Sequence, residues 1–134
     1  MYDTILVATD GSDPATRAAD HAIDLASSFD ADLYSLYVVD TRRYGSSMMS
    51  NADSVAEDLK ERGQEILTDI ASRADVDVTT EVRSGQPSQQ IGEYADEIDA
   101  DLLIIGNRGL TSGGEIGSTA ERVVRYVDRP VITA

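Results

Sequence analysis

The sequence predicts a single α/β domain in which helices cover both faces of a parallel β-sheet. Strand and helix patterns alternate along all 134 residues, which is a usual length for one domain. Two short runs, Thr4–Ala8 and Leu102–Ile105, are entirely apolar, as expected of strands buried on both faces. Each helical stretch has about ten or more residues, enough for a crossover between parallel strands. We therefore treat residues 1–134 as one domain.

The first predicted strand, Thr4–Ala8, leads into the turn Thr9–Pro14. Asp13 in this turn is a candidate N-cap, because proline follows it at a position where its missing N–H costs nothing. A first helix then extends to about Phe29, with alanines recurring on one face. The apolar stretch Leu33–Val39 is the second predicted strand.

A loop of small and polar residues, Thr41–Asn51, separates this strand from the next helix. The capping-box spacing of Ser54–Glu57 predicts that a long second helix starts at Ser54, and we expect it to end near Arg73. Val76–Val82 alternates apolar and polar residues, as a half-buried or edge strand does. Ser84–Pro87 has the composition of a turn.

The last third of the chain predicts two more helix and strand pairs. A third helix at Ser88–Ile98 precedes the apolar strand Leu102–Ile105. Ser118 has capping-box spacing to a glutamate three residues later, which predicts a fourth helix from Ser118 to about Val127. The final predicted strand is Pro130–Ala134.

Charge is the unusual feature of the composition. The chain has 25 acidic and 11 basic residues, for a net charge of -14. Broad binding to nucleic acid or to an anionic membrane needs a basic face, so this balance argues against both. The acid excess is spread along the chain and lysine occurs once, which favours adaptation to a salty cytosol over an acidic surface that recruits a basic partner.

The residue types present also limit the chemistry. There is no cysteine, which excludes disulfides, thiolate metal sites and cysteine nucleophiles. No apolar run approaches the roughly 18 residues of a membrane span, and no basic leader precedes the first strand. We therefore expect a cytoplasmic protein.

Two turns carry the best candidate for a binding site. Ligands of open parallel sheets bind at the carboxyl ends of strands, where the strand order reverses. The turn with Asp10 follows the first strand, and a segment with five glycines in twelve residues, Gly106–Gly117, follows the fourth. Glycine lets backbone N–H groups approach an anion, and the helix N-terminus that follows adds a positive dipole end. The segment predicts a phosphate site, although a flexible loop followed by a simple Ser118 cap is the alternative.

Several segments resemble the universal stress protein family, and the likeness covers essentially the whole chain. They are Asp10-Gly11-Ser12, Val38-Val39-Asp40, Gly106-x2-Gly109 with Gly117-Ser118, and Arg129-Pro130-Val131-Ile132. The resemblance implies a five-stranded parallel sheet in the order 3-2-1-4-5. It also implies a homodimer through antiparallel pairing of Val131–Thr133, which as a terminal edge strand would invite such pairing in any case.

One branch of that family binds ATP, and the resemblance implies roles for this chain's residues. Asp10 would lie beside the phosphates or their Mg²⁺, while Ala8 and Val38 would contact adenine, Val38 through its backbone; Thr9 belongs to the same contact set. The ribose and phosphates would be wrapped by Gly106, Asn107, Arg108, Gly109, Leu110, Thr111 and Ser112. The phosphate tail would be covered by Gly117, Ser118 and Thr119.

This chain departs from the family pattern Gly-x2-Gly-x9-Gly-Ser/Thr at one point. Seven residues rather than nine separate Gly109 from Gly117. The shortening lies in the stretch expected over the phosphates, so AMP or ADP would need less of it than ATP would.

Catalysis has little support in the sequence. The only histidine, His21, lies beside two aspartates on the polar flank of the first helix, where a solvated role is expected. Neither a Gly-x-Ser-x-Gly elbow nor a Gly-x4-Gly-Lys-Ser/Thr loop is present. We expect a binding protein with, at most, slow ATP hydrolysis. The alternatives are a nucleotide-free dimeric scaffold of the same family and, more distantly, a nucleotide-dependent hydrolase or transferase.

Overall fold

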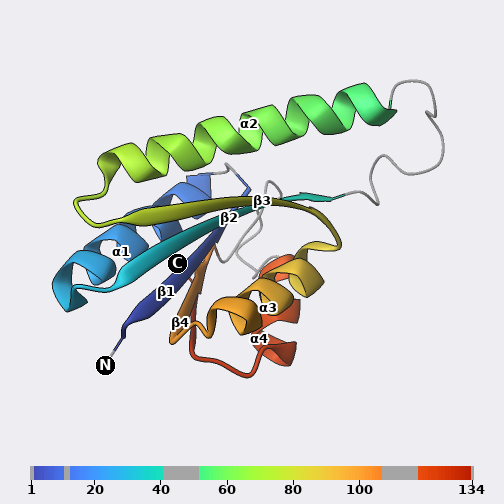
Figure 1. Cartoon of the computed structure of the whole chain (residues 1–134). Coiled ribbons are helices and arrows are strands. Elements are labelled where there is room, and N and C mark those ends of the chain that lie inside the picture. Colours follow the sequence, from blue (N-terminus) through green and yellow to red (C-terminus); the bar gives the residue numbers. More distant parts are fainter. Residues whose placement is uncertain (1, 11–12, 41–51, 107–117, 134) are drawn as a thin grey trace.

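The computed structural model describes residues 2–10, 13–40, 52–106 and 118–133. Its five strands form one parallel sheet in the order β3-β2-β1-β4-β5, which confirms the predicted fold class and strand order (Figure 1). The strands are β1 (Thr4–Thr9), β2 (Asp32–Asp40), β3 (Val78–Gly85), β4 (Leu102–Ile105) and β5 (Val131–Thr133). The helices are α1 (Asp13–Phe29), α2 (Ala52–Arg73), α3 (Pro87–Ile98) and α4 (Ser118–Tyr126).

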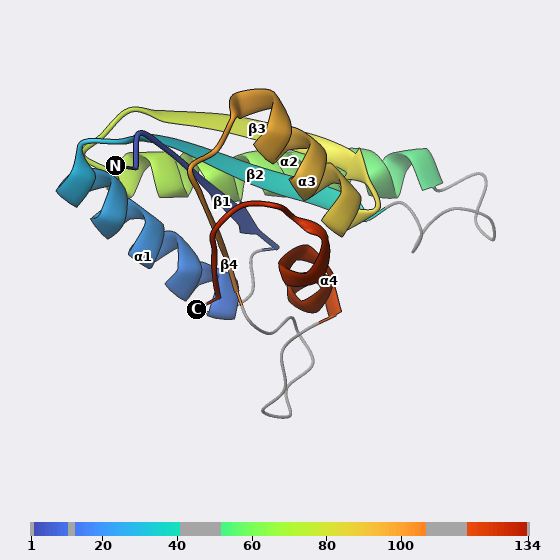
Figure 2. The same ribbon diagram turned by 90° about the horizontal axis from the view of Figure 1, so that it is seen from below.

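Helices cover both faces of the sheet (Figure 2), and an apolar layer on each face holds them against it. Alternate residues of each inner strand point to opposite faces, so one strand supplies both layers. On one face Ile5 and Leu33 pack with residues of α1 and α2; on the other, Leu6 and Leu36 pack with residues of α3 and α4. β1 and β4 are buried along their full apolar runs, as the sequence predicted.

The end of β3 differs from the prediction. Ser84 and Gly85, expected in a turn, continue the strand and pair with Val39 and Asp40 of β2. Gly85 has φ +147°, a conformation that residues with a side chain rarely adopt. Only Gln86 then separates β3 from α3, and its side chain caps the helix by accepting from the backbone N–H of Gln89 at 2.6 Å. Strand and helix thus meet without a loop.

Some helices begin slightly before their predicted positions. α2 begins at Ala52, so Ser54 lies inside the helix and is not its N-cap. α1 begins at Asp13, one residue before the predicted first helical position at Pro14, whereas α4 begins at Ser118 as predicted. Aspartate, asparagine and serine all favour the N-cap position. Where several of them follow one another, the sequence alone does not show which one begins the helix.

Ser35 is a polar residue at the centre of the sheet. Its side chain is fully buried on the α1 and α2 face, and its Oγ has no hydrogen-bond partner among the described residues. Because an unpaired buried hydroxyl is destabilising, we expect Ser35→Ala to raise the free energy of unfolding by about 1 kcal/mol in urea titrations. A loss of stability of that size would instead show that the hydroxyl is hydrogen-bonded.

None of the described helices combines the length and the apolar character needed to cross a bilayer.

Candidate functional site

The strand order reverses between β1 and β4. The chain leaves β1 toward β2 and β3 on one side, then returns to place β4 and β5 on the other. In open parallel sheets this reversal marks the edge where ligands bind, outside the carboxyl ends of the strands. The candidate site is therefore the carboxyl edge around the ends of β1 and β4.

Register places several of the predicted residues at this edge. Ala8 lies opposite Ile105, so Thr9 and Gly106 follow at the same level of the sheet. Thr9 is buried, Gly106 is half-buried and Asp10 is exposed. The two turns that the sequence singled out thus begin side by side.

β2 extends farther than β1 at the same edge. The described β1–β2 pairing ends at Thr9 and Tyr37, whereas β2 continues through Val38 to Asp40 with partners in β3. Beyond Tyr37, β2 is therefore paired on its β3 side and has no register partner in β1. The side chains of Val38 and Ala8 lie on the same face of the sheet. We call this extension of β2 beyond the end of β1 the step. It places the backbone edge of β2 and the apolar side chains of Ala8 and Val38 near Asp10.

α4 contributes its N-terminus. The helix begins at Ser118, after the carboxyl end of β4, and it precedes the amino end of β5. A crossover helix between parallel strands runs opposite to them, so Ser118 and Thr119 belong to the turn that faces the carboxyl edge. The first N–H groups of a helix lack intrahelical acceptors and form the positive end of its dipole. The carboxylate of Glu121 in this first turn pairs with Arg125.

The structure thus brings Ala8, Thr9, Asp10, Val38 and Gly106 to one edge. The remaining predicted residues Asn107, Arg108, Gly109, Leu110, Thr111, Ser112 and Gly117 lie outside the described residues. His21 is exposed on α1, as predicted. Within the described ranges, no group of three or more histidine or acidic side chains is arranged to hold a metal ion.

Sequence reasoning missed a charged cluster next to Val38. Arg83 of β3 is the register partner of Val38, and its guanidinium contacts Glu81 at 3.0 Å and Glu97 at 2.6 Å. The same group lies 4.5 Å from the ring centroid of Tyr94. These four residues form the Arg83 cluster. In the sequence, the charged residues Glu81 and Arg83 at alternate positions of β3 were the only sign of this cluster. They do not reveal that Glu97 of α3 is the second partner of Arg83.

The charged groups in this cluster shift one another's pKa values. The hydrogen bond to Glu97 raises the pKa of Arg83 despite partial burial, and the reciprocal hydrogen bond from Arg83 lowers the pKa of Glu97. Burial is the main reason that the pKa of Tyr94 is raised. The cluster joins the edge strand β3 to α3 through the ion pair of Arg83 with Glu97.

The lowered pKa of Glu97 gives a pH prediction. A carboxylate with a depressed pKa contributes stability above its ordinary pKa, and this contribution is lost as pH falls through the folded-state value. We expect Arg83→Gln to raise the pKa of Glu97 toward its ordinary value in an NMR titration. The variant should also lose less stability than the parent between about pH 7 and about pH 3. An unchanged Glu97 titration would contradict the ion pair.

Comparisons with known proteins agree over the whole chain. The model of the universal stress protein family matches residues 1–134. A universal stress protein of Methanocaldococcus jannaschii is 39% identical, covering 98% of this chain and 81% of its own length. The solved universal stress protein UspA of Lactobacillus plantarum is 30% identical, with a TM-score of 0.81 over 98% of this chain and 97% of its own. A universal stress protein solved in complex with cAMP is also 30% identical, with a TM-score of 0.71 over 99% and 96%.

Proposed function

This chain belongs to the universal stress protein family, and from that premise we propose that it binds an adenine nucleotide at the carboxyl edge of its sheet. The observation that carries the proposal is the step at that edge, where β2 continues past β1 beside Asp10 and Gly106. The related structure in complex with cAMP supports an adenine ligand. The protein would act by binding, as a regulatory component of a stress response, rather than by catalysis.

Each part of the edge would contact a different part of the ligand. Adenine would lie against Ala8 and Val38, with the β2 backbone hydrogen-bonding the base edge. Thr9 and Asp10 would face the ribose and phosphates, and Asp10 would lie near a Mg²⁺ ion carried by the nucleotide. The phosphates would be bound by backbone N–H groups of Gly106, Asn107, Arg108, Gly109, Leu110, Thr111, Ser112, Gly117, Ser118 and Thr119.

The spacing of the glycines and the net charge of the chain bear on how many phosphates the bound nucleotide carries. Seven residues between Gly109 and Gly117 leave less chain to cover a triphosphate. The net charge of -14 repels a triphosphate more strongly than a monophosphate, most of all at low salt. We propose AMP or ADP as better ligands than ATP.

Calorimetric titration with AMP, ADP and ATP tests this proposal. Saturable heat with AMP or ADP at one site per chain is the expected result. No heat with any of the three, from a folded protein, would favour a nucleotide-free scaffold. Release of phosphate from ATP at rates well above background would favour a hydrolase.

We further propose a homodimer formed by antiparallel pairing of β5 with its copy. The sheet has two edges, and they differ in charge. β3 carries Glu81 and Arg83 on its α3 face, and inward-pointing charges disfavour pairing with a second strand. β5 has the uncharged sequence Val131-Ile132-Thr133, and Ile132 is 38% exposed. β5 is therefore the edge better suited to a second copy of the chain.

A further inference from the structure

We propose that Arg129 positions β5 for pairing with the second copy, a role that rests on the homodimer proposed above. The Arg129 cluster consists of Arg129 and three partners: Asp96 in the last turn of α3, and Asp99 and Ala100 in the segment that joins α3 to β4. It lies at the amino end of the sheet, away from the candidate nucleotide site. Its expected effect is therefore on dimerisation and not on nucleotide binding.

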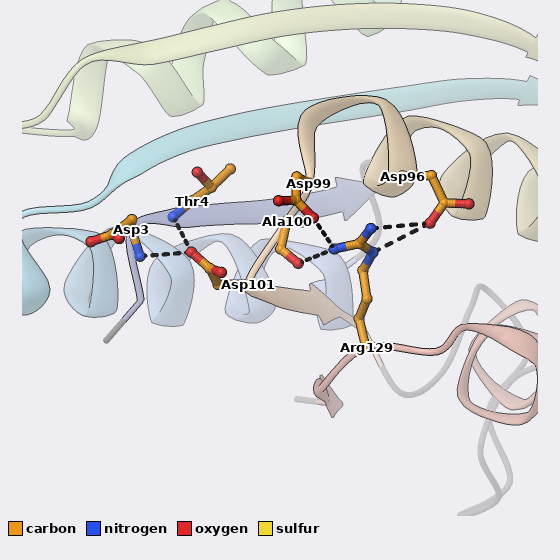
Figure 3. Close-up of polar contacts among 7 residues, drawn as sticks. All are labelled: Asp3, Thr4, Asp96, Asp99, Ala100, Asp101 and Arg129. Atoms are coloured by element: carbon orange, nitrogen blue, oxygen red, sulfur yellow. Dashed lines mark hydrogen bonds and ion pairs between the residues drawn. The ribbon is translucent and has the colours of Figure 1, made fainter.

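All three nitrogens of the Arg129 guanidinium donate hydrogen bonds, to Asp96 in the last turn of α3 and to Asp99 and Ala100 just after it (Figure 3). Its Nη1 donates to the carbonyl oxygen of Ala100 at 2.7 Å and to Oδ1 of Asp99 at 3.2 Å. Its Nη2 and Nε donate to Oδ1 of Asp96 at 3.2 and 3.4 Å. The side chain of Arg129 is 20% exposed; burial lowers its pKa, but the hydrogen bonds to Asp99 and Asp96 and their negative charges leave the pKa raised above its ordinary value.

The segment that Arg129 contacts is itself fixed to the sheet. Asp99 ends α3 in the left-handed conformation, and its backbone N–H donates back to the last turn of the helix. Oδ2 of Asp101 accepts from the backbone N–H groups of Asp3 and Thr4 at the start of β1, at 2.9 and 3.0 Å (Figure 3). Arg129 thus connects the start of β5 to a segment that is anchored on the central strand.

β5 has few other attachments of its own. It is three residues long and pairs on one side only, with Leu103, Ile104 and Ile105 of β4. Just before it, the carbonyl oxygen of Pro130 accepts from the N–H of Leu103 at 2.9 Å. So short a strand gains little from its own pairing against the entropy of ordering it. Val131 also packs against the apolar layer on the α3 and α4 face, and the adjacent Arg129 cluster adds polar anchors just before the strand begins.

The exposure of the aspartate partners indicates that Arg129 affects the position of β5 more than the stability of the whole fold. The side chains of Asp96 and Asp99 are 78% and 93% exposed, so their ion pairs with Arg129 add little to overall stability. The bond to the Ala100 carbonyl, made by a mostly buried planar group, sets geometry in a way that lysine does not reproduce. Loss of Arg129 should therefore loosen β5 while the fold remains stable.

Three variants of the full chain test the role of Arg129. Arg129→Gln removes the charge and the planar fork, and Arg129→Lys keeps only the charge. Arg125→Gln is the matched control, because it removes the same charge from an exposed α4 residue paired with Glu121. The measurements are the dimer dissociation constant by sedimentation equilibrium and the hydrogen-exchange rate of the Leu103 amide.

We expect Arg129→Gln to weaken the dimer about tenfold or more, because the cost of ordering β5 then arises in both subunits. The Leu103 amide should exchange faster, Arg129→Lys should recover only part of each effect, and Arg125→Gln should match the parent. An unchanged dissociation constant and exchange rate in Arg129→Gln would overturn the role of Arg129 while leaving the dimer intact. A parent protein that is monomeric at all concentrations would overturn the dimer and this proposal together, whereas calorimetry reports on nucleotide binding separately.

Discussion

Gly63→Ala is expected to destabilise the protein by about 2 kcal/mol, although alanine is the better helix former. Gly63 is buried in α2, directly over the ring of Tyr37 in β2. A Cβ at this position would stand 2.5 Å from Cδ1 and 2.8 Å from Cγ of that ring. Tyr37 is 7% exposed and packs within the apolar layer on the α1 and α2 face, so the ring or the helix would have to shift against its neighbours. Overpacking of this kind outweighs the gain of roughly 1 kcal/mol in helix propensity.

Gly92→Ala is the matched control for this prediction. Gly92 lies inside α3, and a Cβ there would meet Cγ2 of Val127 at 3.7 Å, which is an ordinary contact. This variant should gain up to about 1 kcal/mol from helix propensity alone. Gly63→Ala should therefore lower, and Gly92→Ala raise, both the urea midpoint and the melting temperature. The melting temperature should change by roughly 4 °C per kcal/mol for a chain of this size. Equal effects of the two substitutions would contradict the close approach of α2 to β2.

The second large effect is expected at the nucleotide site. Gly109→Val should weaken adenine nucleotide binding by about 100-fold, which corresponds to about 2.8 kcal/mol. The proposed contacts in this segment come from backbone N–H groups, and a branched side chain would keep the phosphates away from them. Calorimetry with AMP or ADP measures the loss.

The fold and the dimer should be unaffected by Gly109→Val. Circular dichroism and sedimentation equilibrium check this, and Gly92→Ala again serves as a glycine substitution away from the proposed site. Unchanged affinity in the folded variant would remove Gly109 from the site. Unfolding of the variant would show instead that the glycine is required by the backbone.

The sequence predicted the fold class because the buried strands and the crossover helices have different periods. Ile5–Ala8 and Leu102–Ile105 are apolar at every position and short, which is typical of strands covered on both faces. Boundaries were less predictable. Ser84 and Gly85 have turn composition, yet pairing with the end of β2 extends β3 through them. Pro87 was the one signal for the immediate start of α3, since proline favours the first helical position.

The candidate site was predictable in its location but not in its geometry. Asp10 and Gly106 follow apolar strands, and their meeting at one edge follows from parallel strand order. The extension of β2 past β1 depends on register, which a single sequence does not reveal. The Arg129 and Arg83 clusters likewise join residues far apart in the chain, such as Arg129 and Asp96, that no spacing rule connects.

Native mass spectrometry with added AMP, ADP or ATP tests most directly whether the carboxyl edge binds an adenine nucleotide. It reports ligand identity, stoichiometry and subunit number in one spectrum. We predict a dimer that carries one nucleotide per chain, with AMP or ADP bound at lower concentration than ATP, and loss of the bound mass in Gly109→Val. Spectra that show only the unliganded protein at every nucleotide concentration would contradict a nucleotide-binding function.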